Sequence, residues 1–192
     1  MLKDFVCDSE MIIAIVGMCG SGKSESANYF SSKGLPVVRF GDATEIEVKK
    51  RGLELNPANE KIVRESLRKN LGMDAFAKVN ESRIKDSLKK TKHVIIDGLY
   101  SWEEYLYLAK VFDEQLILLH ICASPKTRQN RLAARKIRPL TPDETKLRDI
   151  AEIENSKKGG PIAIANYTIV NEGTLKELFV DLGKFYVSVI EH

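Results

Sequence analysis

The residues best suited to do chemistry form one run near the start of the chain, Gly17-Met18-Cys19-Gly20-Ser21-Gly22-Lys23-Ser24. They match the phosphate-loop pattern G-x-x-x-x-G-K-[ST]. Glycines let the backbone curl with its N–H groups facing inward, and a helix that begins at about Gly22 adds the positive end of its dipole, so the main chain can bind a polyphosphate. We predict that Lys23 reaches the β- and γ-phosphates, that the Ser24 hydroxyl binds Mg²⁺, and that Glu25 belongs to the nucleotide-binding set.

An aspartate at the end of an apolar run is the second candidate. The segment His93-Val94-Ile95-Ile96-Asp97 predicts a buried strand whose final carboxylate holds Mg²⁺ beside a phosphate loop, directly or through water. Aspartate also ends strands for turn formation alone. Because a phosphate loop is present, we predict Ser24 and Asp97 as the metal-binding residues.

A second carboxylate follows another predicted strand, in Phe40-Gly41-Asp42. Asp42 should emerge at the C-terminal edge of the sheet, where open α/β sheets bind ligands. There it could accept the proton of an attacking hydroxyl. The structural alternative is an N-cap for a helix over residues 43–50, and the two roles are compatible. We predict Asp42 as a catalytic and acceptor-binding residue.

Arginines follow helical spacing in two places. The first set is Arg131, Arg135 and Arg138. Their spacing predicts that Arg131 and Arg135 share one helical face and that Arg138 lies in a link beyond the helix. Guanidinium groups can neutralise a transferring phosphoryl group, so Arg131 and Arg135 are predicted catalytic residues; a solvated basic helix end is the alternative. Arg64 and Arg68 share the spacing, and they are candidates for an acceptor's phosphate or members of an ordinary exposed face.

These residues require a sheet that brings them to one edge. Short apolar, β-branched runs alternate with longer amphipathic ones, which predicts an α/β fold with a parallel sheet and helices on both faces. Together with the phosphate-loop motif, this predicts the P-loop NTPase fold. Five strands are predicted, at residues 12–16, 36–40, 93–97, 115–122 and 167–170. A helical insertion at about residues 43–91, broken near Asn56-Pro57 and Gly72, is where we expect the acceptor site.

A short lid is predicted at about residues 131–142. A helix over 125–136 ends in a basic run, and Thr141-Pro142-Asp143-Glu144 is a capping box with proline at the first position of the next helix. Gly159-Gly160-Pro161 is predicted to end that second helix. A helix, a short basic link and another helix have the shape of a lid.

Composition narrows the class of protein. The 192 residues, 43% of them hydrophobic, suffice for one buried domain over residues 1–192. The formal charge of +3 comes from 30 basic and 27 acidic residues mixed along the chain, and no basic block is dense enough to bind nucleic acid or a membrane. Three irregularly spaced cysteines predict a reduced, cytoplasmic setting. We expect a small anionic partner.

Taken in order, these segments resemble the dephospho-CoA kinases and the uncharacterised dephospho-CoA-kinase-like proteins of archaea. The resemblance runs from Met11 to about Leu182, and its most specific parts are the phosphate loop, residues 40–42, 96–98, 123–135 and 165–174. It implies that Arg131 or Arg135 contacts ATP phosphates. It also implies that the loop of Asn171 and Gly173 lies by the adenine. Asp42 stands where dephospho-CoA kinases keep the Asp thought to deprotonate the ribose 3′-hydroxyl.

Three positions depart from the patterns of these families. Glu45 and Tyr100 stand where related kinases or the archaeal group usually have arginine, and Asn166 stands in place of an aspartate. We expect an ATP- and Mg²⁺-dependent phosphotransferase that acts on dephospho-CoA or a similar nucleotide. The first alternative is a nucleoside or deoxynucleoside monophosphate kinase, whose acceptor is a monophosphate. An ATP-binding regulator without transferase activity is the alternative from another functional class.

Overall fold

The computed structural model describes residues 10–191, and its centre is a sheet of five parallel strands in the order β2-β3-β1-β4-β5. The strands are β1 (Met11–Val16), β2 (Val37–Arg39), β3 (His93–Asp97), β4 (Leu116–Cys122) and β5 (Tyr167–Val170). The predicted phosphate-loop fold and its five strands are confirmed. The strand β2 is shorter than predicted, but the flanking Pro36 carbonyl and Phe40 N–H still bond to β3, each at 2.9 Å.

The register gathers the C-terminal ends of the strands at one edge of the sheet. Asp97, the last residue of β3, pairs with Ile15 of β1 and Arg39 of β2. On the other side of β1, Val16 pairs with His120 of β4. Because all strands are parallel, the segments that follow them meet at this edge. The phosphate loop follows β1, so the sheet holds Asp97 beside it.

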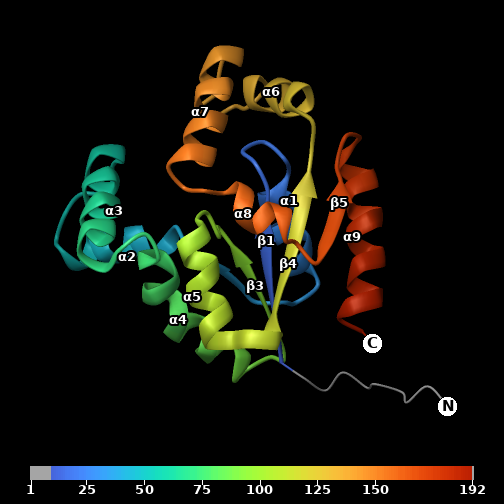
Figure 1. The fold of residues 1–192 in the computed structure, drawn as a ribbon, viewed down its shortest axis with the longest axis horizontal. Coiled ribbons are helices and arrows are strands. Elements are labelled where there is room, and N and C mark those ends of the chain that lie inside the picture. Colours follow the sequence, from blue (N-terminus) through green and yellow to red (C-terminus); the bar gives the residue numbers. More distant parts are fainter. Residues whose placement is uncertain (1–9, 192) are drawn as a thin grey trace.

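Helices cover both faces of the sheet (Figure 1). In chain order they are α1 (Lys23–Ser32), α2 (Asp42–Lys50), α3 (Pro57–Leu71), α4 (Ala75–Leu88), α5 (Trp102–Phe112), α6 (Pro125–Ala133), α7 (Pro142–Glu154), α8 (Gly159–Ala163) and α9 (Leu175–Val189), with a 3-10 turn η1 (Asp113–Gln115) before β4. Ile13 of β1 packs in a core with α1 and α9, whereas Ile12 packs in a second core with α4 and α5. Burial on both faces explains why β1 is a continuous apolar run.

The helical insertion consists of α2, α3 and α4, and Figure 1 shows α3 beyond the edge of the sheet. The predicted breaks are confirmed. Asn56 caps α3, since its side chain accepts the N–H of Asn59 at 2.9 Å, and Pro57 follows at the first helical position. Gly72 separates α3 from α4 with a φ of +95°, a left-handed conformation that favours glycine.

The region predicted as a lid is formed by α6, a link over residues 134–141, and α7. The capping box is confirmed: Thr141 accepts the N–H of Glu144 at 3.2 Å, and Glu144 accepts the N–H of Thr141 at 2.7 Å. Two predicted boundaries are wrong. The first helix ends at Ala133, so Arg135 lies in the link. The second ends at Glu154, and Gly159 begins the short helix α8 instead of ending α7.

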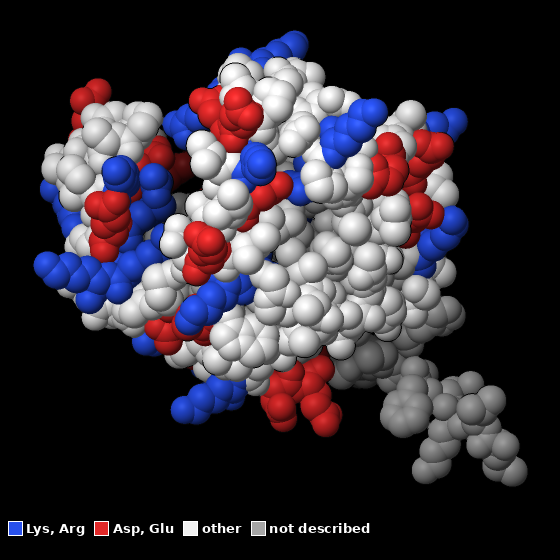
Figure 2. Space-filling model, turned by 45° about the horizontal axis from the view of Figure 1, so that its top comes forward, with Lys and Arg blue, Asp and Glu red and all other residues white. Residues whose placement is uncertain are grey.

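Acidic and basic side chains are interspersed on the surface. Figure 2 shows Lys and Arg close to Asp and Glu across the face that it presents. Several are neighbours on one helix, such as Lys85 with Glu81 and Arg64 with Glu60. Of the helices in residues 10–191, none combines the length and the hydropathy that crossing a bilayer would require.

Candidate active site

The phosphate loop leaves the N-terminus of α1 open to a ligand. Gly22 is the N-cap residue and has no side chain to cap the first N–H groups of α1. A Cβ at Gly22, whose φ is +108°, would also lie 2.4 Å from the Asn171 amide nitrogen, and one at Gly17 would lie 2.5 Å from the Ile121 carbonyl oxygen. Glycine is therefore required by close packing at both positions, and the free N–H groups favour an anion.

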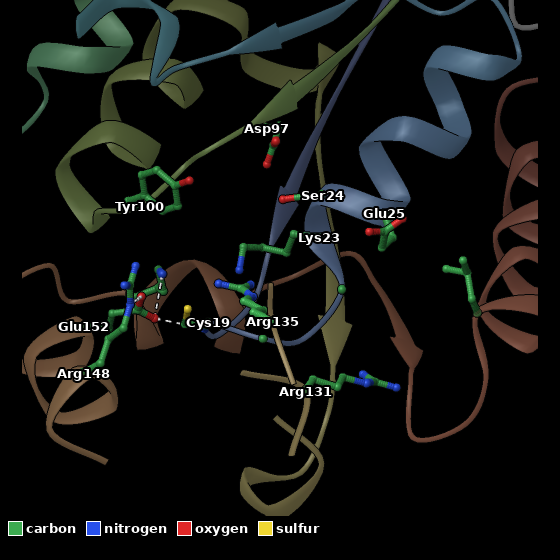
Figure 3. Close-up of a pocket in the computed structure, with 14 residues that line it drawn as sticks. Cys19, Lys23, Ser24, Glu25, Asp97, Tyr100, Arg131, Arg135, Arg148 and Glu152 are labelled. Carbon is green, nitrogen blue, oxygen red and sulfur yellow. Dashed lines mark hydrogen bonds and ion pairs between the residues drawn. The ribbon is translucent and has the colours of Figure 1, made fainter. Parts of the chain in front are cut away.

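A cavity of about 520 Å³ lies over this loop (Figure 3). Nine of the predicted site residues line it: Cys19, Gly20, Gly22, Lys23, Ser24, Glu25, Asp97, Arg131 and Arg135. Within residues 10–191, Gly17, Met18 and Ser21 are not among its lining residues. They support the loop, since the Met18 carbonyl accepts the Lys23 ammonium at 2.9 Å and the Ser21 N–H at 3.2 Å.

Lys23 is a partly buried cation with only a neutral carbonyl as its hydrogen-bond partner within residues 10–191. Burial and, to a smaller extent, repulsion from Lys158 lower the pKa of Lys23 to about 8, against the attraction of Glu152 and Asp97. A polyphosphate would supply the negative charge that this site lacks. The cavity is therefore electrostatically suited to a polyphosphate group.

Ser24 and Asp97, the predicted metal-binding residues, line the same cavity. Burial raises the pKa of Asp97, while Lys23 and Arg39 oppose this shift; Arg39 Nε lies 3.8 Å from the Asp97 carboxylate. No group of three or more His, Cys, Asp or Glu side chains that could hold a metal occurs in residues 10–191. A hydroxyl and a carboxylate fit Mg²⁺, which usually takes one or two protein oxygens and completes its shell with phosphate oxygens and water.

The arginines predicted as a group have separate positions. Arg131 is fixed, because it donates to the carbonyls of Asn171 and Gly173, both at 2.9 Å, and to the Asn171 side chain at 3.2 Å. Asn171 in turn donates to the Ser21 carbonyl at 2.8 Å, so the 171–173 loop is tied to the phosphate loop. Arg135 lines the cavity from the link, whereas Arg138 is not among the lining residues in the described part of the chain.

Asp42 lines a second cavity, of about 350 Å³, which shares Asp97 and Tyr100 with the first. The predicted capping role is wrong: in the described part of the chain Gly41, and not Asp42, is the N-cap residue of α2, and Asp42 is the first helical residue. Asp42 Oδ2 instead accepts Arg83 Nη2 at 2.8 Å. Sequence reasoning missed Arg83, because the two residues are far apart in the chain and no motif joins them.

Arg64 and Arg68 do not act on one cavity. Arg64 lines the Asp42 cavity and pairs with Glu60 at 3.3 Å. Arg68 lines a third cavity, of about 330 Å³, toward α7, and its buried Nε has no hydrogen-bond partner in residues 10–191. Tyr100 lines all three cavities. The two arginines are one helical turn apart on α3, but they line different cavities, and Tyr100 is a wall of both.

Sequence reasoning missed three charged residues that line the cavity over the phosphate loop: Arg148, Glu152 and Lys158. The first two lie on α7, and Lys158 lies in the turn that follows it. Glu152 accepts the Cys19 N–H at 3.2 Å and Arg148 Nε at 3.3 Å, and it lies 2.8 Å from the Lys158 ammonium. The spacing of four between Arg148 and Glu152 is a usable signal for one helical face. Lys158 gives no such signal, since Lys157-Lys158 has the pattern of a solvated turn.

The fold and this cavity define a class: a phosphate-loop protein with the architecture of small-molecule kinases. A shikimate kinase from Bacteroides thetaiotaomicron has the same fold, with a TM-score of 0.59 and 13% identity, over 95% of this chain and 99% of that one. A gluconokinase from Sinorhizobium meliloti 1021 has a TM-score of 0.57 and 16% identity, over 94% of each chain. A family model described as an AAA domain matches residues 13–152.

The chain belongs to the UPF0200 family. A UPF0200 protein of Thermococcus kodakarensis is 36% identical over 94% of this chain and 98% of its own length. Relatives from Pyrococcus abyssi and Methanocaldococcus jannaschii are 37% and 33% identical, over 90% and 95% of this chain and 93% and 92% of their own lengths.

Proposed function

We propose that the protein is a kinase that transfers the γ-phosphoryl group of ATP, with Mg²⁺, to a hydroxyl of a small nucleotide-like acceptor, and that dephospho-CoA is the first acceptor to test. The observation that carries this proposal is the adjacency of two cavities. Lys23, Ser24 and Asp97 line the first, and Asp42 lines the second, which shares Asp97 and Tyr100 with it. The nucleotide and the acceptor would thus meet at Asp97.

The phosphate loop and the cations around it would bind the nucleotide. N–H groups of residues 17–24 and the Lys23 ammonium hold the phosphates, and Arg131 and Arg135 approach from the α6 side. The 171–173 loop, fixed by Arg131, would lie by the adenine. Ser24 and Asp97 would hold Mg²⁺, which neutralises charge on the phosphate oxygens when bound. Catalysis would consist of positioning and charge stabilisation.

The acceptor side supplies the proton transfer. In the proposed step the acceptor's hydroxyl oxygen forms a bond to Pγ, the bond from Pγ to the β–γ bridging oxygen breaks, and its electron pair leaves with ADP. The hydroxyl proton passes to Asp42, whose Oδ2 is oriented by Arg83. Asp42 is close enough to Asp97 for its charge to act on the pKa of that carboxyl.

The charges in the Asp42 cavity favour a hydroxyl over a phosphate as the attacking group. Four carboxylates line this cavity, Asp42, Glu45, Glu60 and Asp97, and its two guanidiniums, Arg39 and Arg64, lie in ion pairs with Asp97 and Glu60. A nucleoside monophosphate would bring two further negative charges to this place and would need free cationic clamps. This favours the hydroxyl of dephospho-CoA over the nucleoside monophosphates.

A panel assay tests the proposal. ATP consumption is measured with dephospho-CoA and with each nucleoside monophosphate in turn, for the wild-type protein and for Lys23→Ala, which should lose at least about a hundredfold in turnover. Turnover with dephospho-CoA that requires Lys23 supports the proposal. Turnover with a nucleoside monophosphate but not with dephospho-CoA makes the monophosphates the acceptor class. ATP binding without turnover on any acceptor instead supports an ATP-binding regulator without transferase activity.

A further inference from the structure

Glu152 has the contacts that a bound phosphoryl group would have. Its Oε2 accepts the N–H of Cys19 in the phosphate loop at 3.2 Å and lies 2.8 Å from the Lys158 ammonium, and its Oε1 accepts Arg148 Nε at 3.3 Å. Figure 3 shows the carboxylate directed at Cys19 with Arg148 beside it. A loop N–H together with an ammonium and a guanidinium is a typical anion-binding set.

Lys158 is a buried cation of the same cavity. Its side chain is 3% exposed, and its ammonium lies 4.9 Å from the centre of the Tyr100 ring. Lys158 and Lys23 repel each other across the cavity, which contributes to the lowered pKa of Lys23. A buried ammonium is stable only with a charged or strongly polar partner, and Glu152 is the carboxylate that fulfils this need. The cations of the cavity are therefore in place before any phosphate arrives.

The backbone of α7 is fixed to the phosphate loop one turn before Glu152. Arg128, on α6, binds both carboxylate oxygens of Asp149 at 2.6 and 2.8 Å, and it also donates to the Cys19 carbonyl at 3.3 Å. A rotation of the Glu152 side chain is thus enough to free the Cys19 N–H. The same rotation leaves Arg148 and Lys158 in the cavity.

We propose that Lys158 and Arg148 are catalytic residues that bind the γ-phosphoryl group, and that Glu152 is their positioning residue, which occupies the phosphate's place until a nucleotide displaces it. This inference rests on the proposed kinase function. It assigns the charge stabilisation of the transfer largely to α7 and the turn after it, whereas Arg131 holds the 171–173 loop. The γ-phosphate then takes over the contacts of a carboxylate, so Lys158 and Arg148 have an anionic partner in both states.

Binding of two nucleotides that differ in the γ-phosphate tests the inference without an acceptor. We compare ADP with the non-hydrolysable analogue AMP-PNP, both with Mg²⁺, by isothermal titration calorimetry. Lys158→Met should weaken AMP-PNP binding about tenfold or more and change ADP binding less than about threefold. Arg148→Gln, at a more exposed residue, should act in the same direction. Lys157→Met is the matched control, because Lys157 is 63% exposed and pairs with Glu103 outside the cavity.

Glu152→Gln separates a displaced carboxylate from a merely structural one. Removal of the competing charge should tighten AMP-PNP binding about threefold or more, while the melting temperature of the nucleotide-free protein falls because Lys158 and Arg148 lose their partner. Glu154→Gln, on the same helix, should change neither. Weaker AMP-PNP binding in Glu152→Gln, or equal losses for ADP and AMP-PNP in both Arg148→Gln and Lys158→Met, overturns the inference. Failure of the proposed function is distinguishable, since it shows in the acceptor panel, as no turnover on any acceptor or as turnover that does not depend on Lys23, whereas the inference is tested by nucleotide binding alone.

Discussion

Lys23 should take up a proton when a nucleotide binds. In the free protein, burial and Lys158 lower its pKa from 10.5 to about 8. A polyphosphate favours the charged ammonium and returns the pKa toward its ordinary value. At a pH of about 9, roughly a tenth of Lys23 is charged in the free protein and nearly all in the complex, so binding takes up about 0.9 proton; at a pH of about 7 the uptake is about 0.1.

Calorimetry of AMP-PNP–Mg²⁺ binding in two buffers of different ionisation enthalpy measures this uptake. At a pH of about 9, phosphate groups, with a second pKa of about 6, are already deprotonated and do not contribute, so the measurement is made there. In Lys23→Met the uptake should vanish from whatever binding remains. An uptake below about 0.2 proton at a pH of about 9 in the wild type, or equal uptake in Lys23→Met, would refute the reasoning.

The same shift links Lys23 to the stability of the free protein. Because the folded pKa lies below the unfolded one, the unfolded state binds more protons between a pH of about 8 and about 10.5, and the free energy of unfolding rises with pH across this window. A shift from 10.5 to about 8 corresponds to about 3 kcal/mol. Lys23→Met should therefore stabilise the nucleotide-free protein near neutral pH, which chemical denaturation can measure.

Three further perturbations probe other residues. Asp42→Asn keeps the side chain's shape but removes the base, so turnover on dephospho-CoA should fall about a hundredfold or more with little change in ATP affinity; turnover within about threefold of the wild type at saturating Mg²⁺ would exclude the base role. Asp149→Asn breaks an ion pair in which the Asp149 side chain is 18% exposed and the Arg128 side chain 5% exposed, and it should lower the free energy of unfolding by about 3 kcal/mol. The control Asp181→Asn breaks an exposed pair with Lys184 and should change the free energy of unfolding by less than about 1 kcal/mol. Equal effects of the two variants would contradict the argument. Burial raises the pKa of Glu104 from 4.5 to about 7, so its contribution to stability is complete below a pH of about 4.5 and is lost as the pH rises through about 7; denaturation curves of Glu104→Gln should lack this decline, and an unchanged decline would assign it to another group.

The phosphate loop, the strands and the capping box could be predicted because each is determined by residues close together in the chain. Glycines with a required backbone shape, β-branched runs and the Thr141–Glu144 reciprocal bonds all leave local patterns. Gly160 shows the limit of such patterns. It looks like a helix terminator, but a Cβ there would lie 2.4 Å from the Trp102 ring. Glycine at this position allows α8 to approach Trp102 closely, which sequence spacing does not reveal.

The charged partners of the site could not be predicted, because they meet only through tertiary structure. Arg83 reaches Asp42 from α4, and Glu152 reaches the Cys19 N–H from α7. Arg131 and Arg135 were expected to act together, but the early end of α6 at Ala133 places Arg135 in the link while Arg131 binds the 171–173 loop. Helical spacing predicts which residues share a face; it does not predict what that face meets.

Tyr100 is a common wall of the three cavities, and this has a consequence for binding affinity. Under the proposed function, a ligand that shifts the Tyr100 ring in one cavity would change the shape of the other two, and the nucleotide and the acceptor would then not bind independently. Such coupling is reciprocal in free energy: whatever factor the nucleotide imposes on acceptor affinity, the acceptor imposes on nucleotide affinity.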